Sequence, residues 1–154
     1  MAMLVGKHVN KIDRKGRVSV PKSFRENLVD PENNLIYLFP SFNYPAIEGC
    51  DQAFMNLIGD SIEDLELFSK DRDELASFII ENACPLSIDP EGRIVIPVDL
   101  LKEVGITDQA VFVGRGRGQF QIWNPDAYAE HRGSTMESLR ARGATLKLLR
   151  RAGE

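Results

Sequence analysis

The sequence IDRKGRVSVP at residues 12–21 returns 76 positions later as IDPEGRIVIP at residues 88–97. Asp, Gly, Arg and Pro occupy the same places in both copies, and the apolar positions stay apolar. The copies differ most at their centre, where Arg14-Lys15 in the first stands against Pro90-Glu91 in the second. We expect the shared residues to carry structure and the differing ones to carry function.

Each copy predicts a tight turn between two strands. Asp13 or Asp89, at the first turn position, accepts hydrogen bonds from backbone N–H groups, and Gly16 or Gly92, at the fourth, adopts the positive φ that closes the loop. A type I turn followed by a glycine bulge commonly joins the strands of a hairpin. The strands expected in these hairpins are residues 4–11 with 17–20 and residues 84–88 with 93–96.

The two halves of the chain share one order of predicted elements: strand, turn, strand, short helix, strand, strand. Pro21 and Pro97 suit the first position of a short helix, because the fixed φ of proline is already helical there. Trp123, Phe112 and Phe120 alternate within strands, which favours core packing over a base-stacking surface. The remaining expected strands are residues 35–39, 46–48, 110–113 and 119–123.

Helices are predicted between the halves and after the second one. Apolar stripes in residues 51–82 indicate two helices, which either cover the core or present a packing surface to neighbours. Asn124-Pro125 suits a helix start, and Ser134 with Glu137 fits a capping box before a helix that carries Leu139, Leu146 and Leu149. The last fifteen residues are rich in Arg and Gly, and their order stays open.

The composition bounds the class of protein. With 43% apolar and 27% charged residues, the 154-residue chain is globular. The repeat favours two small halves that pack against each other. The chain has no apolar run of membrane-spanning length and no signal-peptide pattern at its N-terminus, so we expect a cytoplasmic protein. Cys50 and Cys84 fit no metal or redox motif, and no catalytic motif is present. We expect no enzyme activity and no metal.

Charge is strongly segregated along the chain, although the net charge is only −4. Residues 1–25 sum to +6, residues 48–91 to −10 and residues 132–154 to +4. A basic N-terminus and a basic tail therefore flank an acidic centre. This pattern suits a protein that binds a polyanion with one face and other copies of itself with another.

The first turn carries the functional hypothesis. Arg14 and Lys15 replace the stiff Pro90-Glu91 pair, so that three cations lie within the four residues 14–17. The plainer interpretation is a solvated turn, but clustered cations repel one another unless an anion is near, and Arg17 can fork onto a phosphate or a guanine edge. Arg93 keeps the same position without those cations, which indicates a structural role that Arg17 can share.

A second basic stretch, Gly114-Arg115-Gly116-Arg117-Gly118, has two interpretations. Runs of this composition bind single-stranded nucleic acid in some proteins. A five-residue link between two strands is more simply a flexible hairpin loop, and we favour that.

Taken together, these motifs resemble the MraZ family of bacterial transcriptional regulators, which are built from tandem domains of the AbrB type. The features that carry the resemblance are the Gly6 region, the two copies at residues 12–21 and 88–97, Val113-Gly114 and residues 120–123. The match covers about residues 3–132. It divides the chain into a first AbrB-like domain (3–50), a helical segment (51–82), a second AbrB-like domain (83–130) and a basic C-terminal tail (131–154).

The resemblance implies a mainly β fold with added helices (α+β), in which two swapped-hairpin β-barrel halves form an intramolecular pseudo-dimer. It also implies a homo-oligomeric ring without a cofactor. Family members bind short, G-containing direct repeats in double-stranded DNA upstream of the division and cell-wall gene cluster that includes their own gene, and typically repress it. Here the DNA contacts would be Lys15 and Arg17, with Arg14 as a third, in a nucleoid-associated protein. Asp13, Gly16, Asp89, Gly92 and Arg93 would shape the turns.

A different class of function also fits part of the sequence. The acidic centre suits a protein-interaction module, such as an antitoxin-like or scaffold protein that grips a basic partner. Steep loss of DNA affinity with rising salt would favour phosphate binding, whereas no binding at low salt would favour the interaction module.

Overall fold

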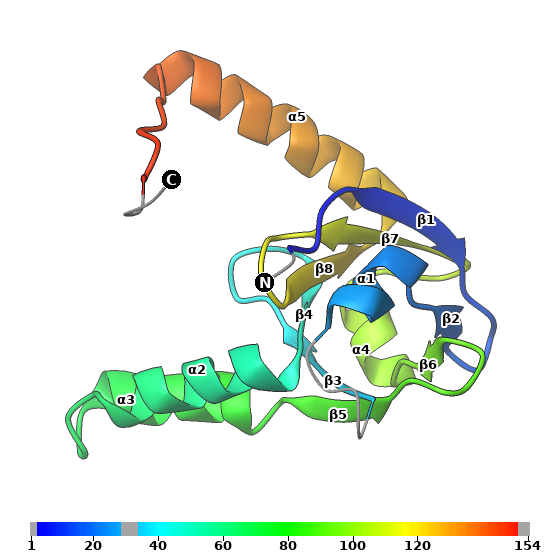
Figure 1. Ribbon diagram of the computed structural model, residues 1–154, viewed down its shortest axis with the longest axis horizontal. Coiled ribbons are helices and arrows are strands. Elements are labelled where there is room, and N and C mark those ends of the chain that lie inside the picture. The colour runs from blue at the N-terminus through cyan, green and yellow to red at the C-terminus, as the bar shows by residue number, and fades with distance from the viewer. Residues whose placement is uncertain (1–2, 29–33, 151–154) are drawn as a thin grey trace.

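The computed structural model describes residues 3–28 and 34–150, which form a mixed α+β fold of antiparallel sheets and helices (Figure 1). The strands are β1 (Lys7–Lys11), β2 (Arg17–Ser19), β3 (Leu35–Pro40), β4 (Ala46–Cys50), β5 (Cys84–Ser87), β6 (Arg93–Val95), β7 (Gln109–Gly114) and β8 (Gln119–Trp123). The helices are α1 (Lys22–Asn27), α2 (Gln52–Glu63), α3 (Lys70–Leu75), its π-helical continuation η1 (Ala76–Ile80), α4 (Val98–Glu103) and α5 (Pro125–Arg142). The order strand, strand, helix, strand, strand occurs in both halves, as predicted.

The strands pair across the two copies. The larger sheet has the order β1-β7-β8-β4-β3-β5, and β2 pairs with β6 in a second sheet of two strands. The local hairpins predicted around each turn are therefore wrong, since β1 pairs with β7 and β5 with β3. In the described residues the strands flanking the first turn share one isolated backbone bridge, Ile12–Val18, and a side-chain hydrogen bond from Asn10 to the Ser19 carbonyl. The swapped hairpins that the resemblance implied are present.

Cross-copy hydrogen bonds explain this exchange. The Ile96 N–H donates to the Gly16 carbonyl at 2.8 Å, and the Val20 N–H donates to the Gly92 carbonyl at 2.9 Å. Each turn thus completes its bonding on the strand of the other copy. A turn motif fixes the reversal of the chain, but it does not specify which strand the returning segment will pair with.

The two-stranded sheet shows the internal symmetry most directly. Val18 faces Ile94, while Arg17 faces Val95 and Ser19 faces Arg93. Because equivalent residues are 76 positions apart, a pseudo-twofold axis passes through the Val18–Ile94 pair. The same operation brings the larger sheet onto itself, with β4 and β8 paired at its centre.

One core serves both copies. Val18 and Ile94 lie in it beside Phe24 of α1, which contacts Phe112 and Phe120 at ring-centroid distances of 6.5 and 5.8 Å. Trp123 is 1% exposed and belongs to a smaller adjoining cluster, so the prediction that the aromatic residues are core is confirmed.

The hairpin interpretation of the Gly-Arg stretch is also confirmed. Residues 115–118 link β7 to β8 as a hairpin, and Arg115 within this loop donates to Gln121 Oε1 at 2.9 Å. Cys50 is buried, and burial raises the pKa of its thiol to about 12, as expected of a structural side chain. Cys84 is half-buried.

Two helical elements project from the sheets on the same side of the molecule (Figure 1). The helices predicted in residues 51–82 are α2 and α3 with η1, which lie side by side as an arm. The other projection is α5, which leaves the second half after β8 and has no buried residue.

The helix predicted to start at Ser134 is wrong in its bounds. The Asn124 side chain caps α5 by accepting from the N–H groups of Asp126 and Ala127, so the helix already runs through position 134. It ends at Gly143, whose φ of 61° is left-handed, and Leu146 and Leu149 lie beyond it. The predicted tail extends to residue 154, of which 151–154 lie outside the described residues.

Candidate nucleic-acid interface

The Asp13 carboxylate organises the first turn. The Gly16 N–H donates to the Asp13 carbonyl at 3.0 Å, and the N–H groups of Lys15 and Arg17 both donate to Asp13 Oδ1 at 2.9 Å. Arg17 Nε donates to Asp13 Oδ2 at 2.7 Å. One carboxylate therefore closes the loop and also fixes the direction of the arginine side chain.

The second turn repeats this arrangement bond for bond. The N–H groups of Glu91 and Arg93 donate to Asp89 Oδ1 at 2.9 Å, and the Gly92 N–H donates to the Asp89 carbonyl at 2.9 Å. Arg93 Nε donates to Asp89 Oδ2 at 3.3 Å. The residues shared by the two copies thus form a common structural unit.

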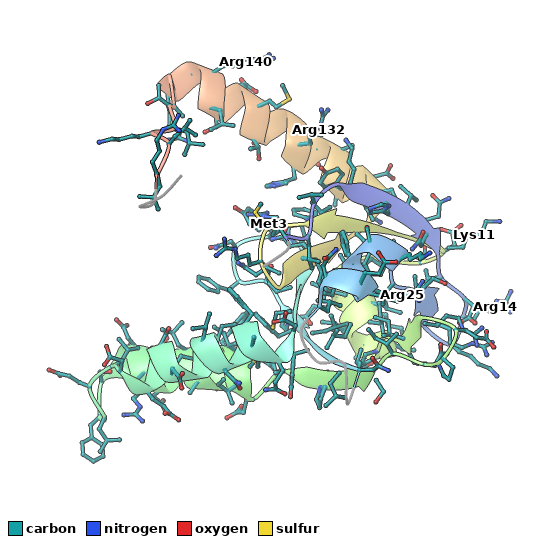
Figure 2. All side chains as sticks on the ribbon, in the orientation of Figure 1. Met3, Lys11, Arg14, Arg25, Arg132 and Arg140 are labelled. Atoms are coloured by element: carbon teal, nitrogen blue, oxygen red, sulfur yellow. The ribbon has the colours of Figure 1, made fainter. Side chains whose placement is uncertain are left out.

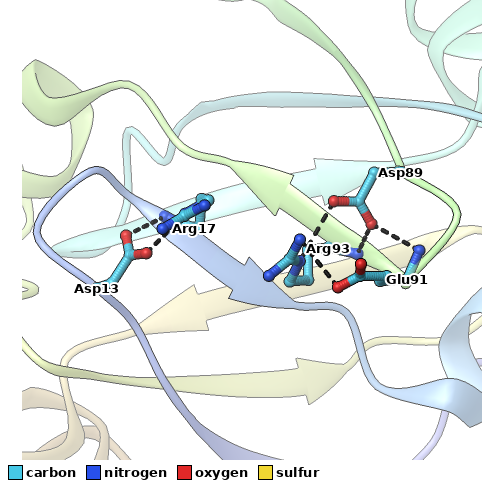
Figure 3. A network of polar contacts seen from close by, with 5 residues as sticks. All are labelled: Asp13, Arg17, Asp89, Glu91 and Arg93. Carbon is cyan, nitrogen blue, oxygen red and sulfur yellow. Dashed lines mark hydrogen bonds and ion pairs between the residues drawn. The ribbon is translucent and has the colours of Figure 1, made fainter.

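The copies differ in what surrounds the guanidinium group. Arg93 Nη2 pairs with Glu91 Oε2 at 2.9 Å, so two carboxylates hold Arg93 (Figure 3). In the first copy Lys15 stands at the position of Glu91 and supplies a second positive charge instead. Among the described residues, Asp13 is the one ion-pair partner of Arg17, and the Nη groups of Arg17 make no ion pair. Arg17 therefore keeps donors for an external anion.

Both aspartates favour their charged form. The backbone N–H of Arg17, followed by its side chain, lowers the pKa of the Asp13 carboxyl below its ordinary value of 3.8. The backbone N–H of Arg93 is the leading cause of the same change in the pKa of Asp89. The hydrogen bonds to each carboxylate thus favour its charged form in the folded state.

We expect both turns to loosen only in acid, as the pH falls through the lowered pKa values. A depressed carboxyl pKa adds stability that is present above the unfolded value, near 3.9, and is lost as the folded carboxyl becomes protonated. Side-chain carboxyl NMR shifts of Asp13 and Asp89, titrated from neutral pH into acid, measure both midpoints. A midpoint at or above the unfolded value for either residue would contradict the hydrogen-bonding scheme.

The cationic turn lies at an open edge of the molecule. Arg14, Lys15 and Arg17 are all exposed, and the Arg17 side chain retains 45% of its accessible surface. Figure 2 shows Arg14 and Lys11 projecting on the same side of the molecule. Because β2 and β6 are antiparallel, the Asp89 turn lies at the opposite end of their sheet. The structure therefore brings the three predicted DNA contacts together.

Other N-terminal cations are engaged within the fold. Lys7 Nζ lies 5.7 Å from the centroid of the Tyr128 ring. Arg25 Nε donates to the Val20 carbonyl at 3.1 Å, and its guanidinium packs so closely on Gly92 that a Cβ there would overlap it. In the sequence Arg25 was one of the cations in the +6 sum over residues 1–25, and its support of the second turn was missed. The signal that could have found it is the 76-residue offset of the repeat. The residue equivalent to Arg25 in the second copy is Leu101, which is buried.

The described residues also bear on metal sites and membrane spans. They contain no cluster of three or more His, Cys, Asp or Glu side chains that could hold a metal ion. None of the helices they form has the length and apolar character needed to cross a membrane.

The fold and turns together define a swapped-hairpin protein with an internal repeat and one cationic turn. No protein-family model matches the chain, but curated relatives do. It is 40% identical over 154 residues to the transcriptional regulator MraZ of Gluconobacter oxydans, covering 98% of this chain and 91% of the relative. For the MraZ protein of Pelagibacter ubique the identity is 39%, covering 94% and 93%. For that of Parvibaculum lavamentivorans it is 44%, covering 80% and 77%. The chain belongs to the MraZ family of transcriptional regulators.

Proposed function

We propose that this chain is a sequence-specific regulator that binds double-stranded DNA through Arg14, Lys15 and Arg17. The observation that carries the proposal is the contrast between the two arginines, since Glu91 neutralises Arg93 whereas Lys15 adds charge beside Arg17. Guanidinium Nη donors held at a fixed angle suit the O6/N7 edge of guanine or a phosphate. The relatives' names as transcriptional regulators support this assignment.

The proposed regulator is a repressor that acts on short direct repeats. The family resemblance points to a promoter upstream of the division and cell-wall gene cluster, and to a protein that is cytoplasmic and nucleoid-associated. We propose a ring of identical chains, because such a ring presents identical turns in one orientation and so suits repeats of one direction. Several modest contacts then act together through effective concentration.

A DNA titration tests the proposal. Sequences selected from random DNA supply the probe, and fluorescence anisotropy follows binding across a salt series. If turn cations contact phosphates, the logarithm of the affinity falls linearly with the logarithm of salt, with a slope of about −0.9 for each neutralised phosphate. No binding at low salt would contradict the proposal and favour a protein-interaction module.

Arg17→Ala is expected to weaken specific binding by roughly 5- to 150-fold for each bound turn, because a forked arginine contact is worth about 1–3 kcal/mol. The fold remains, because the Asp13 carboxylate still accepts from the backbone N–H groups of Lys15 and Arg17. Anisotropy titration and circular dichroism measure the two effects.

Arg93→Ala is the matched control in the second turn. Its ion pairs are half-exposed and partly screened by water, so we expect a stability loss of about 1 kcal/mol and little change in DNA affinity. An equal loss of DNA affinity in both variants, with folding intact, would show that the second turn also contacts DNA.

A further inference from the structure

The end of α5 and the residues after it form a surface that the chain itself leaves open. Within residues 139–150, defined here as the basic tail segment, Leu146, Leu148 and Leu149 are 87, 68 and 82% exposed. The same segment carries four cations and no acid, namely Arg140, Arg142, Lys147 and Arg150. Leucines that are this exposed and lie this close together mark a surface that binds a partner.

The segment has a defined geometry. Gly143 ends α5 in the left-handed conformation, and two backbone bonds close the helix: the Gly143 N–H donates to the Arg140 carbonyl and the Ala144 N–H to the Leu139 carbonyl. This pattern turns the chain sharply at a helix end. Residues 144–150 therefore lie beyond the end of α5, away from the sheets (Figure 1).

The tip of the helical arm has the opposite charge and a matching apolar patch. Within residues 63–74, defined here as the arm tip, Leu67 is 63% and Phe68 is 95% exposed. Six acids surround them against Lys70 and Arg72, which gives a net charge of −4 against +4 for the basic tail segment. All six acidic residues are exposed: Glu63, Asp64, Glu66, Asp71, Asp73 and Glu74.

Within one chain the basic tail segment and the arm tip do not bond to each other. No hydrogen bond or ion pair joins residues 52–82 to residues 134–150. The α5 helix and the arm leave the sheets as separate projections (Figure 1). Each surface therefore stays available to another molecule.

We propose that the basic tail segment of one chain docks on the arm tip of a neighbouring copy. Opposite charges steer and orient the contact, and the burial of leucines against Leu67 and Phe68 supplies affinity. Contact between different patches is head-to-tail, which is the interface type that closes into a ring. This inference rests on the proposed ring and adds the surfaces that build it.

DNA is the other polyanion that a basic segment could meet. Phosphate contacts account for the four cations, but they leave the three exposed leucines in water. The arm tip accounts for both the charges and the leucines. A second copy is therefore the better partner.

Charge reversal on each surface tests the contact. The tail variant carries Arg140→Glu, Lys147→Glu and Arg150→Glu, and light scattering after size exclusion measures its molar mass. We expect the mass to fall by at least half from the wild-type assembly, because the altered tail meets an unaltered acidic arm tip. Circular dichroism checks that the fold is unchanged.

The matched arm variant carries Glu63→Lys, Glu66→Lys and Glu74→Lys and should lose mass equally. Mixing the two variants in equal amounts should restore the wild-type mass, since the acidic tail then meets a basic arm and the unaltered tail meets an unaltered arm. Restoration on mixing requires a contact between copies.

Each other outcome overturns the inference. If both variants keep the wild-type mass, the ring stands but uses other surfaces. If the tail variant loses DNA affinity at unchanged mass while the arm variant keeps its affinity, the tail binds DNA. If the wild type has the mass of a single chain, 17.3 kDa, the ring falls with the inference, whereas the Arg17 titration still decides DNA binding.

Discussion

Arg14→Pro combined with Lys15→Glu will reduce affinity for the selected DNA by about 100-fold or more. The double change gives the first turn the central residues of the second and removes three units of positive charge from it. It also places a carboxylate where Glu91 sits, 2.9 Å from the guanidinium of Arg93. Arg17 would be captured in the same way. Loss of its contact alone is worth about 1–3 kcal/mol.

The backbone of the first turn should accept both changes. The two turns share their hydrogen bonds, and the second already holds proline at position 90. In the described residues the Arg14 N–H donates no hydrogen bond, so a proline removes none. We therefore expect unfolding by urea to be little changed while anisotropy shows the loss of DNA binding.

The reciprocal exchange, Pro90→Arg with Glu91→Lys, is the control. It frees Arg93 and adds charge at the opposite end of the β2–β6 sheet, so DNA affinity should not fall. Retained affinity in the Arg14→Pro, Lys15→Glu variant would show that DNA recognition lies outside the first turn.

The local structure of the turns was predictable because it depends on residues close in sequence. Asp13 and Gly16 define the loop by themselves, and comparison with Asp89 and Gly92 separated shared residues from variable ones. The same reasoning predicted the order of elements and the burial of Phe112, Phe120 and Trp123. Local hydrogen bonding and apolar alternation are properties that a sequence states directly.

Strand pairing was not predictable from the residues by themselves, since a hairpin and its swapped form bury the same faces. The preference for β6 over β1 as the partner of β2 comes from bonds at Gly16 and Gly92 to residues about 70–80 positions away. The contact between Arg25 and Gly92 was missed for the same reason, because the two residues lie in different copies. The family resemblance, rather than composition, supplied the swapped topology.

Gly16→Ala will destabilise the protein more than Gly92→Ala, although the two glycines have nearly the same backbone. Their φ angles are 89° and 82°, a left-handed region that costs alanine about 1–2 kcal/mol at either site. The surroundings differ. A Cβ on Gly16 would overlap the Ile96 backbone carbonyl, whereas one on Gly92 would meet the end of the flexible Arg25 side chain.

The difference follows from what can move. Arg25 can swing away at the loss of its bond to Val20, but Ile96 is 0% exposed and its N–H is bonded to the Gly16 carbonyl. Relieving the overlap of an alanine Cβ at position 16 with the Ile96 carbonyl therefore requires the first turn to separate from the strand of the other copy. We expect a total loss of about 3 kcal/mol or more for Gly16→Ala and about 1–2 kcal/mol for Gly92→Ala, measured by urea unfolding at one protein concentration. Equal losses would show that left-handed strain alone governs both sites and that the contact with Ile96 relaxes without cost. A larger loss at Gly16 would show that the second half of the chain holds the first turn in place.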